Sequence, residues 1–303
     1  MIRKCFCVIS ILFISMPGES MEKSPHASEW AEELTVAQEI ARCAGQEILA
    51  IQRSGQNLQI ENKLGVNQLM SPVTIADQKA NQLICQTLVA HFPTYGLLTE
   101  EEVTDERLLK AVQRWPDAKM SWIIDPLDGT KAFINGGTDY GIHIGLTQNG
   151  KAILGVNYYP VTDICYYAVQ GYGSYKQVGE NPPQRLYIAI SQIEEIRAIS
   201  NTDPTETAPI YQALIQRSKF TALDSCGWKI CSIAEGNYDL YISMGVRGGA
   251  WDYCSSDIIL REAGGFISDL KGQPIDYCKN RLEQGAIVCG HKELYEQVLQ
   301  VTR

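Results

Sequence analysis

Hydrophobic positions recur every three or four residues in two segments near the beginning of the chain. The first segment runs from Leu34 to Ile51, and the second follows the sequence SPVTIAD and ends near Pro93. This spacing gathers apolar side chains on one face of a helix, so two amphipathic helices are predicted. The buried side of the second helix is expected to hold Ala80, Leu83, Ile84 and Leu88.

Short apolar runs after the second helix predict strands of a sheet. The segments YGLL and SWIID are read as buried strands, each followed or ended by acidic residues. Two further apolar runs flank Asn149-Gly150, a dipeptide that suits the positive φ angles of a type I′ hairpin turn. The segment DICYYAVQGYGSYKQV adds more strand, with its turn at Gly171 and Gly173.

Pro182-Pro183 marks the predicted boundary between two halves, residues 21–183 and 184–303. The second half alternates strand and helix, in the order IRAIS (strand), IYQALIQRS (helix), GWKICSIAEG (helix), DLYIS (strand), DYCSSDIILREAGG (helix), a Lys271-Gly272 hairpin, AIVCG (strand) and a final helix from His291. Helices and sheets therefore follow one another in layers without a regular βαβ rhythm. This order favours an α/β protein, more closely an α+β layered α-β-α-β-α sandwich, over a doubly wound parallel sheet.

Residues 1–20 differ from the rest of the chain. Arg3 and Lys4 precede an apolar run from Cys5 to Met16, which has the outline of a secretory signal and is too short to span a membrane. An equally open interpretation makes Met21 the true start and the upstream piece a mis-assigned extension. The expected location is cytoplasmic, or outside the cytoplasm if the leader is a true signal, and no membrane association is expected.

Composition and charge exclude several classes of function. The formal net charge of −9 argues against binding to a nucleic-acid polymer, which requires a basic face, but leaves a small phosphorylated ligand open. None of the ten cysteines lies in a C-x-x-C pair, so reduced, mostly buried thiols are expected. The four histidines are scattered, and His143 is expected to be a packed or surface residue, not a metal ligand.

The segment WIIDPLDGTKAF contains the first candidate chemistry. Asp125 and Asp128 follow an apolar strand closely enough to repel each other when both are ionised. Gly129 permits a sharp bend and Thr130 can begin a helix. Two carboxylates and the Leu127 carbonyl suit a hard cation such as Mg²⁺, and amides at the following helix start suit an anion. The structural alternative makes Asp128 a helix cap and Asp125 an ordinary turn residue.

Other acids are placed similarly, at strand ends or helix starts. Asp77 ends SPVTIAD, Glu100 and Glu101 follow YGLLT, and Asp252 precedes a helix in GGAWDYCSSD. Each acid alone would more often be a loop residue or a cap. Together with the Asp-Pro-Leu-Asp segment they predict an acidic metal centre.

These segments carry a family resemblance. LLTEE, WIIDPLDGTKAF and AWDYCSSDIILREAGG, in this order and spacing, resemble the signature motifs of the inositol monophosphatase superfamily, and the likeness runs from about Leu34 to the last helix. It implies the layered fold of inositol monophosphatases and fructose-1,6-bisphosphatases. It also implies a lithium-sensitive, Mg²⁺-dependent phosphomonoesterase with two or three cations and a small phosphorylated substrate.

The resemblance also implies a role for each matching residue. Asp125 would contribute to both main cations, the first shared with Glu100 and the Leu127 carbonyl, the second with Asp128 and Asp252. Glu101 would border a weaker third cation. Asp77 would belong to the same acidic set of metal-binding residues. The catalytic residues would be Asp77, Glu100 and Thr130, of which Asp77 and Thr130 would orient the attacking water. The backbone amides of Gly129 and Thr130 would receive the phosphate.

The substrate is the least determined element. Lys131 after Asp-Gly-Thr, and Lys229 within GWKIC, resemble the 3′(2′),5′-bisphosphate nucleotidases, which implies hydrolysis of adenosine 3′,5′-bisphosphate to AMP and phosphate. Ser243 stands where inositol enzymes carry a glutamate. Lys229 could contact the second phosphate or simply face solvent. Small residues Cys254, Ser255 and Ser256 replace the family's usual alanines and glycine, and helix packing is expected to survive.

Three alternatives stay open at this point. Inositol monophosphatase or histidinol-phosphate phosphatase would share the same metal centre with a different leaving group. An inactive metal-binding interaction protein would use the scaffold without chemistry, although every acid of the motif set and Thr130 are present.

A homodimer is one arrangement that the tyrosine-rich strands around Tyr158 and Tyr166 would permit, since these residues suit sheet packing or a subunit contact.

Overall fold

The computed structural model describes residues 24–55, 57–64, 70–189, 195–200, 218–244, 248–282 and 285–302. Residues 1–20, for which a leader is predicted, lie outside these ranges, as does the helix predicted over 210–218 apart from its last residue. Within the described ranges, no helix is both long enough and apolar enough to cross a membrane.

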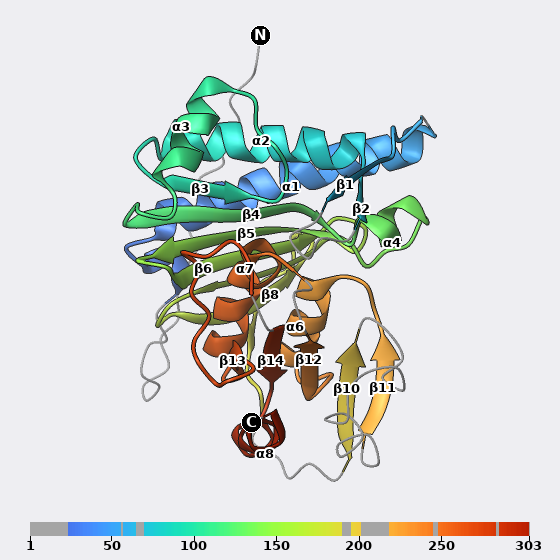
Figure 1. Ribbon diagram of the computed structural model, residues 1–303, viewed down its shortest axis with the longest axis vertical. Coiled ribbons are helices and arrows are strands. Elements are labelled where there is room, and N and C mark those ends of the chain that lie inside the picture. Colours follow the sequence, from blue (N-terminus) through green and yellow to red (C-terminus); the bar gives the residue numbers. More distant parts are fainter. Residues whose placement is uncertain are drawn as a thin grey trace.

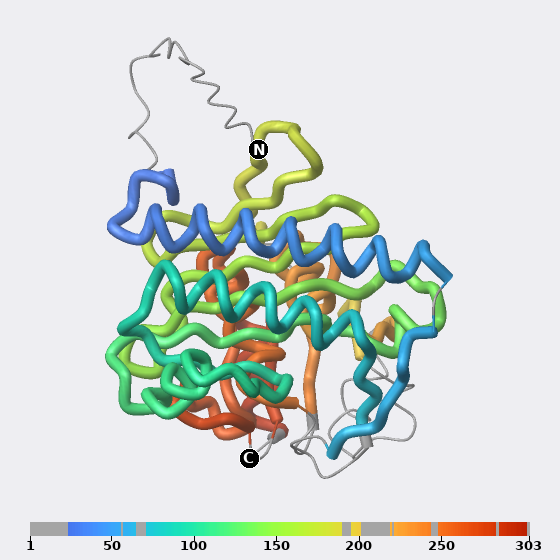
Figure 2. The backbone as a smooth tube through the Cα atoms, turned by 90° about the horizontal axis from the view of Figure 1, so that it is seen from above, coloured from blue at the N-terminus to red at the C-terminus, as the bar shows by residue number. Residues whose placement is uncertain are grey.

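Two long helices and a shorter one form the outermost layer of the first half (Figures 1 and 2). They are α1 (Ala31–Ser54), α2 (Ile75–His91) and α3 (Glu106–Arg114). Helices α1 and α2 lie side by side across one face of the sheet below them, as the view from above shows. Both helices confirm the predicted periodicity, with one exception. Leu83, expected inside, is 36% exposed, while Asn81 and Cys85 are buried instead.

The second layer is a seven-stranded sheet with the order β3-β4-β5-β6-β7-β8-β9. Its strands are β3 (Gly96–Thr99), β4 (Met120–Asp128), β5 (Gly141–Gln148), β6 (Lys151–Tyr159), β7 (Ile164–Val169), β8 (Gly173–Val178) and β9 (Gln184–Leu186). The hairpin at Asn149-Gly150 is confirmed, with φ angles of 50° and 73°. The first sheet continues through β9, just beyond Pro182-Pro183; the division of the chain at residue 183 stays a prediction.

A buried pair of helices forms the middle layer, and a second sheet lies below it. The helices are α6 (Cys226–Ala234) and α7 (Ala250–Glu262). The sheet has the order β11-β10-β12-β14-β13, with β10 (Ile196–Ser200), β11 (Ser218–Ala222), β12 (Leu240–Met244), β13 (Phe266–Asp269) and β14 (Gly285–Cys289). Helix α8 (Lys292–Thr302) covers its far side. A turn occurs at Gly272 as predicted, but no strand follows it directly: β13 pairs with β14 after an irregular connection.

Three apolar cores separate the layers. One lies between α1, α2 and the first sheet, a second surrounds α6 and α7, and a third lies between the second sheet and α8. Close contact in the middle layer depends on glycine. A Cβ on Gly155 would lie 2.1 Å from the Ser255 carbonyl oxygen, and one on Gly145 would lie 2.6 Å from Cys254 Sγ. Ser255 and Ser256 are fully buried and hydrogen-bonded to Asn157, so the small polar residues pack as expected. The α-β-α-β-α sandwich is confirmed.

The remaining short elements lie at the edges of these layers. They are the 3₁₀ turn η1 (Pro25–Ala27), the two-stranded ribbon β1 (Glu61–Leu64) and β2 (Met70–Val73), and α4 (Thr130–Ile134). The β1-β2 ribbon connects α1 to α2, and α4 follows β4 directly. Both elements carry residues of the candidate site.

Candidate metal centre

A bulge in β4 brings both carboxylates of the Asp-Pro-Leu-Asp segment to one face of the sheet. Asp125 pairs with His143 on β5, whereas Asp128 pairs with Gly141, so three steps along β4 match two along β5. In a regular strand, residues three apart point to opposite faces, and the extra residue corrects this. Since Ile123 belongs to the core around α6 and α7, both acids face that helical layer. The sequence predicted a tight turn here; the structure shows a bulged strand that continues to Asp128.

Local chemistry explains why the strand deforms at this point. Pro126 has no N–H to donate to the sheet, and the Leu127 N–H donates to Asp125 Oδ1 at 3.0 Å instead. Gly129 then adopts a φ of 86°, and a Cβ there would lie 2.7 Å from the Asp139 carbonyl oxygen. Only glycine fits both requirements without strain. The chain therefore leaves the strand sharply and enters α4 at Thr130.

The amino end of α2 places Asp77 against Thr130. Asp77 Oδ2 accepts hydrogen bonds from the Thr74 N–H at 2.7 Å and from the Thr74 hydroxyl at 2.6 Å. Asp77 Oδ1 remains directed at the Thr130 hydroxyl, 3.0 Å away, which also lies 3.1 Å from the Leu127 carbonyl oxygen. Burial raises the pKa of Asp77 to about 6, although the bonds from Thr74 lower it. This arrangement holds a carboxyl group with a near-neutral pKa beside a hydroxyl.

The amino end of α6 holds the Asp128 carboxylate. The Cys226 and Gly227 N–H groups donate to it at 3.2 Å and 3.0 Å, and the Ser225 hydroxyl donates to the same group. Backbone N–H groups at the start of a helix favour a negative charge. Asp128 is therefore oriented by residues almost a hundred positions further along the chain, and it does not cap its own helix α4.

Asp252 enters the site from the amino end of α7. Its carboxylate accepts the Gly249 N–H at 2.6 Å. Burial raises the pKa of Asp252 well above its ordinary value, and the charges of Glu100 and Asp128 raise it further. Asp125 shows the same direction of pKa shift for the same causes, with Asp252 among its neighbours. Four acids thus converge from three parts of the chain: Glu100 from the segment after β3, Asp125 and Asp128 from β4, and Asp252 from α7. Their mutual repulsion requires positive charge.

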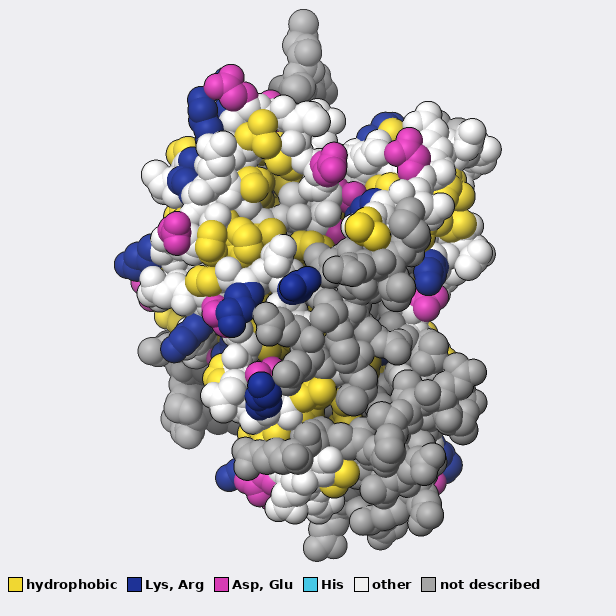
Figure 3. Space-filling view, viewed as in Figure 1, with side chains coloured by type: hydrophobic (Ala, Val, Ile, Leu, Met, Phe, Trp, Pro, Cys, Tyr) yellow, Lys and Arg dark blue, Asp and Glu magenta, His cyan; other side chains and the backbone are white. Residues whose placement is uncertain are grey.

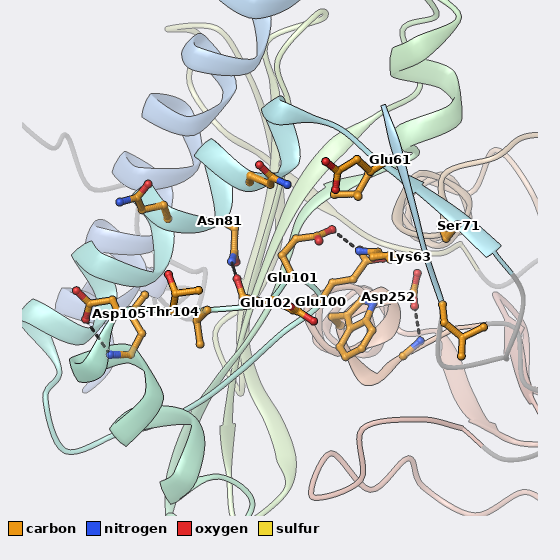
Figure 4. Close-up of a pocket in the computed structure, with 18 of the residues that line it drawn as sticks. Glu61, Lys63, Ser71, Asn81, Glu100, Glu101, Glu102, Thr104, Asp105 and Asp252 are labelled. Atoms are coloured by element: carbon orange, nitrogen blue, oxygen red, sulfur yellow. Dashed lines mark hydrogen bonds and ion pairs between the residues drawn. The ribbon is translucent and has the colours of Figure 1, made fainter. Parts of the chain in front are cut away.

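Lys63 on β1 supplies part of that charge. Its ammonium lies 3.0 Å from Glu100 Oε1 and also contacts Glu101 Oε1. In Figure 4 a dashed line joins the ammonium to one carboxylate of this pair. Burial lowers the pKa of Lys63, but the two glutamates outweigh this and raise it. The pKa of Glu101 is raised to about 7, mainly by burial. Sequence reasoning missed Lys63, because only the β1-β2 pairing carries it to the end of β3.

A cavity of about 890 Å³ opens beside these acids (Figures 3 and 4). In Figure 3, acidic and basic side chains lie in the notch at the upper right of the face shown. Glu100, Glu101 and Asp252 line the cavity together with Lys63, and α2 and the segment after β3 form another part of its wall. The centre is therefore open to a small polar ligand.

The two predicted substrate lysines have different surroundings. Lys131 is exposed on α4, next to Thr130. Lys229 is completely buried, and its ammonium donates to the carbonyl oxygens of Leu223 at 3.1 Å and Asp224 at 2.9 Å. Burial lowers the pKa of Lys229, while the charges of Asp128 and Asp252 act in the opposite direction. The alternative in which Lys229 faces solvent is wrong: it is fully buried, and its ammonium lies within electrostatic range of the Asp128 and Asp252 carboxylates.

The donor set fits magnesium. Carboxylates of Glu100, Asp125, Asp128 and Asp252, with the Leu127 carbonyl, offer the hard oxygen ligands that Mg²⁺ prefers. Asp125 and Asp252 are buried with pKa values raised by neighbouring acids, which is the condition that a bound divalent cation relieves. The interpretation of Asp125 as an ordinary turn residue does not explain this convergence.

Comparison with known proteins identifies the family. The inositol monophosphatase family model matches residues 29–303, nearly the whole chain. The chain belongs to the inositol monophosphatase family. It is 32% identical over 243 residues to the 3′(2′),5′-bisphosphate nucleotidase CysQ of Aggregatibacter actinomycetemcomitans, covering 77% of this chain and 87% of the relative. It is 30% identical over 283 residues to inositol-1-monophosphatase of Bacillus subtilis, covering 91% and 100%.

The fold comparison agrees with the family membership. The crystal structure of the extragenic suppressor protein suhB from Bartonella henselae superposes with a TM-score of 0.73 over 90% of this chain and 98% of that one, at 23% identity. The predicted family and layered fold are confirmed. As a member of the inositol monophosphatase family, this protein is a metal-dependent phosphatase, which also confirms the enzyme prediction against the inactive alternative.

Stabilisation by Mg²⁺ should depend on pH in a defined direction. Folding raises the pKa of Asp77 to about 6 and that of Glu101 to about 7, so the metal-free fold binds protons that the unfolded chain has lost. Their protonated forms stabilise the metal-free fold, and that contribution disappears as pH rises through 6 and 7. Cations need the ionised forms. The difference in Tm between Mg²⁺-loaded and EDTA-treated protein should therefore shrink from about pH 8 to pH 5. A constant difference would contradict the carboxylate assignment.

Proposed function

We propose that this member of the inositol monophosphatase family is a 3′(2′),5′-bisphosphate nucleotidase that hydrolyses adenosine 3′,5′-bisphosphate to AMP and phosphate. The observation that carries the proposal is a buried ammonium, that of Lys229, within electrostatic range of the metal acids Asp128 and Asp252. A bisphosphate presents a second anion in addition to the one undergoing hydrolysis, and it needs such a cation.

The metal ligands are proposed residue by residue. Glu100, Asp125, Asp128, Asp252 and the Leu127 carbonyl would hold two Mg²⁺ ions, and Glu101 would border a third, with Asp77 in the same acidic group. When bound, these cations offset the acidic field, polarise the phosphate ester and make a nearby water easier to deprotonate. From the resemblance to the inositol monophosphatase superfamily, Li⁺ is expected to inhibit the enzyme by competing with Mg²⁺ at one of these positions.

Thr130 and Asp77 are proposed to handle the proton of the attacking water. The Thr130 hydroxyl donates to Asp77 Oδ1 across 3.0 Å, which leaves its own oxygen able to accept a proton from water. The water oxygen forms a bond to phosphorus as the bond from phosphorus to the 3′-oxygen breaks, and the 3′-oxygen takes a proton from solvent water. Backbone N–H groups of Gly129 and Thr130 are proposed to receive the phosphate, with Lys131 beside them.

Inositol monophosphatase activity is the second candidate. The full-length similarity to the Bacillus subtilis enzyme favours it, since 100% of that relative is covered. A phosphate-release assay tests both candidates, together with the histidinol-phosphate phosphatase alternative. Its substrates are adenosine 3′,5′-bisphosphate, inositol 1-phosphate and histidinol phosphate, each with Mg²⁺ and with EDTA. A kcat/KM highest for inositol 1-phosphate would overturn the nucleotidase assignment while leaving the phosphatase chemistry intact.

Lys229→Met should separate substrates by their second phosphate. Methionine keeps the buried bulk and removes the charge, so kcat/KM for the bisphosphate should fall about 10- to 100-fold more than for inositol 1-phosphate, as expected for a lost charged hydrogen bond. The ammonium also supports the carbonyl oxygens of Leu223 and Asp224, so the Tm of the variant must be measured. Equal losses on both substrates would assign Lys229 to structural support alone.

Lys176→Met is the matched control for this variant. Lys176 lies on strand β8 and forms an ion pair with Glu235 at 2.9 Å. It has no proposed part in binding substrate. Its removal should leave the ratio of the two kcat/KM values unchanged.

Homodimer formation and the location of the protein stay predictions. Size-exclusion chromatography would test the first, and fusion of residues 1–20 to an export reporter would test the second.

A further inference from the structure

One buried nitrogen donor lies among the metal acids and has no part in the proposed reaction. His143 on β5 is fully buried, and neither ring nitrogen has a hydrogen-bond partner among the residues that the structure describes. Buried polar groups without partners are uncommon and require an explanation. A packed or surface histidine was expected here, and His143 is packed. Within the described part of the chain, packing alone leaves Nδ1 without a polar partner and gives Nε2 only the nearby Asp128 carboxylate, without a hydrogen bond.

The β4-β5 pairing aims this imidazole at the carboxylates. His143 is the direct partner of Asp125, so the two side chains share a face of the sheet, and the bulge returns Asp128 to that face. Donor atoms of Asp125, Asp128 and His143 all lie within 4.8 Å of one another. His143 Nε2 lies 3.3 Å from Asp128 Oδ2.

We propose that Asp125, Asp128 and His143 form a binding site for a borderline transition-metal ion such as Zn²⁺ or Co²⁺, and that its occupation excludes Mg²⁺ from the shared carboxylates. Zinc bonds to nitrogen and oxygen are about 2.0–2.2 Å long, so two ligands at a tetrahedral angle lie about 3.3–3.5 Å apart. The distance between His143 Nε2 and Asp128 Oδ2 has this value. Imidazole suits Zn²⁺ and Co²⁺, whereas Mg²⁺ prefers oxygen.

Hydrogen bonds from neighbouring residues orient the carboxylate ligands, as they do in known metal sites. The Gly227 N–H and the Ser225 hydroxyl donate to Asp128, and the Leu127 N–H donates to Asp125. Gly227 also brings α6 against the imidazole, since a Cβ there would lie 2.2 Å from His143 Nε2. The inference goes beyond the proposed function, because it concerns binding to the free protein and needs no substrate.

Zn²⁺ affinity of the chelator-treated protein, measured by competition with a chromophoric chelator, tests the site. His143→Asn should weaken Zn²⁺ binding at least about 10- to 100-fold, because loss even of a group that only orients a ligand costs that much. His291→Asn is the matched control: His291 also faces a carboxylate, Asp239, at 3.5 Å, but in another part of the fold. Unchanged Zn²⁺ affinity in His143→Asn would overturn the proposal.

Two measurements on the unaltered protein keep the test independent of how a variant folds. With ¹⁵N-labelled histidine, one equivalent of Zn²⁺ should shift a ring nitrogen of His143; with four histidines in the chain, its resonance can be assigned. Zn²⁺ should also reduce apparent Mg²⁺ affinity in calorimetry, as expected for shared carboxylates. An unshifted His143 resonance, or additive binding of both metals, would refute the site. All these readouts are independent of phosphatase activity, so they can fail while the proposed function stands.

Discussion

Asp125→Asn should abolish Mg²⁺-dependent phosphatase activity without unfolding the protein. Asp125 is 1% exposed and is the acid proposed to contribute to both main cations. Loss of one preorganised electrostatic contact commonly costs about 10²–10³ in kcat, so loss of a shared ligand should cost about 10³ or more. Phosphate release with saturating Mg²⁺ measures the effect. The same loss is expected for Asp128→Asn.

The stability of Asp125→Asn should change in the opposite direction from its activity. Burial and the charges of Glu100, Asp128 and Asp252 raise the pKa of Asp125, which means that its ionised form is unfavourable in the metal-free fold. An amide removes this repulsion, so the EDTA-treated variant should melt at the same temperature as the native protein or higher. Added Mg²⁺ should no longer raise its Tm. Near-native turnover would refute the metal assignment.

Asp257→Asn provides the contrasting control. Asp257 is also a buried acid of α7, but it pairs with Arg261 and accepts a hydrogen bond from the Tyr277 hydroxyl at 2.8 Å. The amide keeps one acceptor oxygen for these two donors and removes the charge that pairs with Arg261, so this variant should melt at a lower temperature. Below its melting temperature, its dependence on Mg²⁺ should be native. The two variants together distinguish an acid that binds cations from one that supports the fold.

The sequence predicted those parts of the site that depend on local order. Asp125 and Asp128 end a buried strand, and Asp77 and Asp252 lie in the first turns of helices, so spacing along the chain placed each acid at the end of an element. The spacing of apolar residues likewise predicted most of the helices and strands, because it too depends only on local order along the chain. The β4 bulge was not foreseen, because it is defined by the register of pairing with β5.

Contacts between distant segments account for what sequence reasoning missed. Lys63 meets Glu101 across 38 positions, and Ser225 meets Asp128 across 97, through layers that no local pattern specifies. The burial of Lys229 was not foreseen for a related reason. Helix α6 is buried on nearly all sides, so it has no polar face for its lysine, and its ammonium is satisfied by backbone carbonyl oxygens instead.

Thr130→Ala should slow the chemical step while leaving cation and substrate binding largely intact. The variant loses the hydroxyl that donates to Asp77 Oδ1 at 3.0 Å, but it keeps the backbone N–H of residue 130 and every proposed metal ligand. Loss of positioned proton transfer typically costs about 10²–10⁴ in rate, so kcat should fall by that factor with KM little changed. Thr130→Ser, which retains a hydroxyl, should recover most of the activity.

Asp77→Asn tests whether the hydroxyl and the carboxyl group act as one unit. An amide at this position cannot take the proton that Thr130 passes on, so the single variant should lose activity to a similar extent. Groups that act together are strongly non-additive, and the double variant should therefore be no slower than the slower single one. Multiplying losses would mean independent roles. A raised KM with unchanged kcat in Thr130→Ala would instead assign the hydroxyl to substrate binding, and the proton acceptor would then have to be sought elsewhere among the acids of the site.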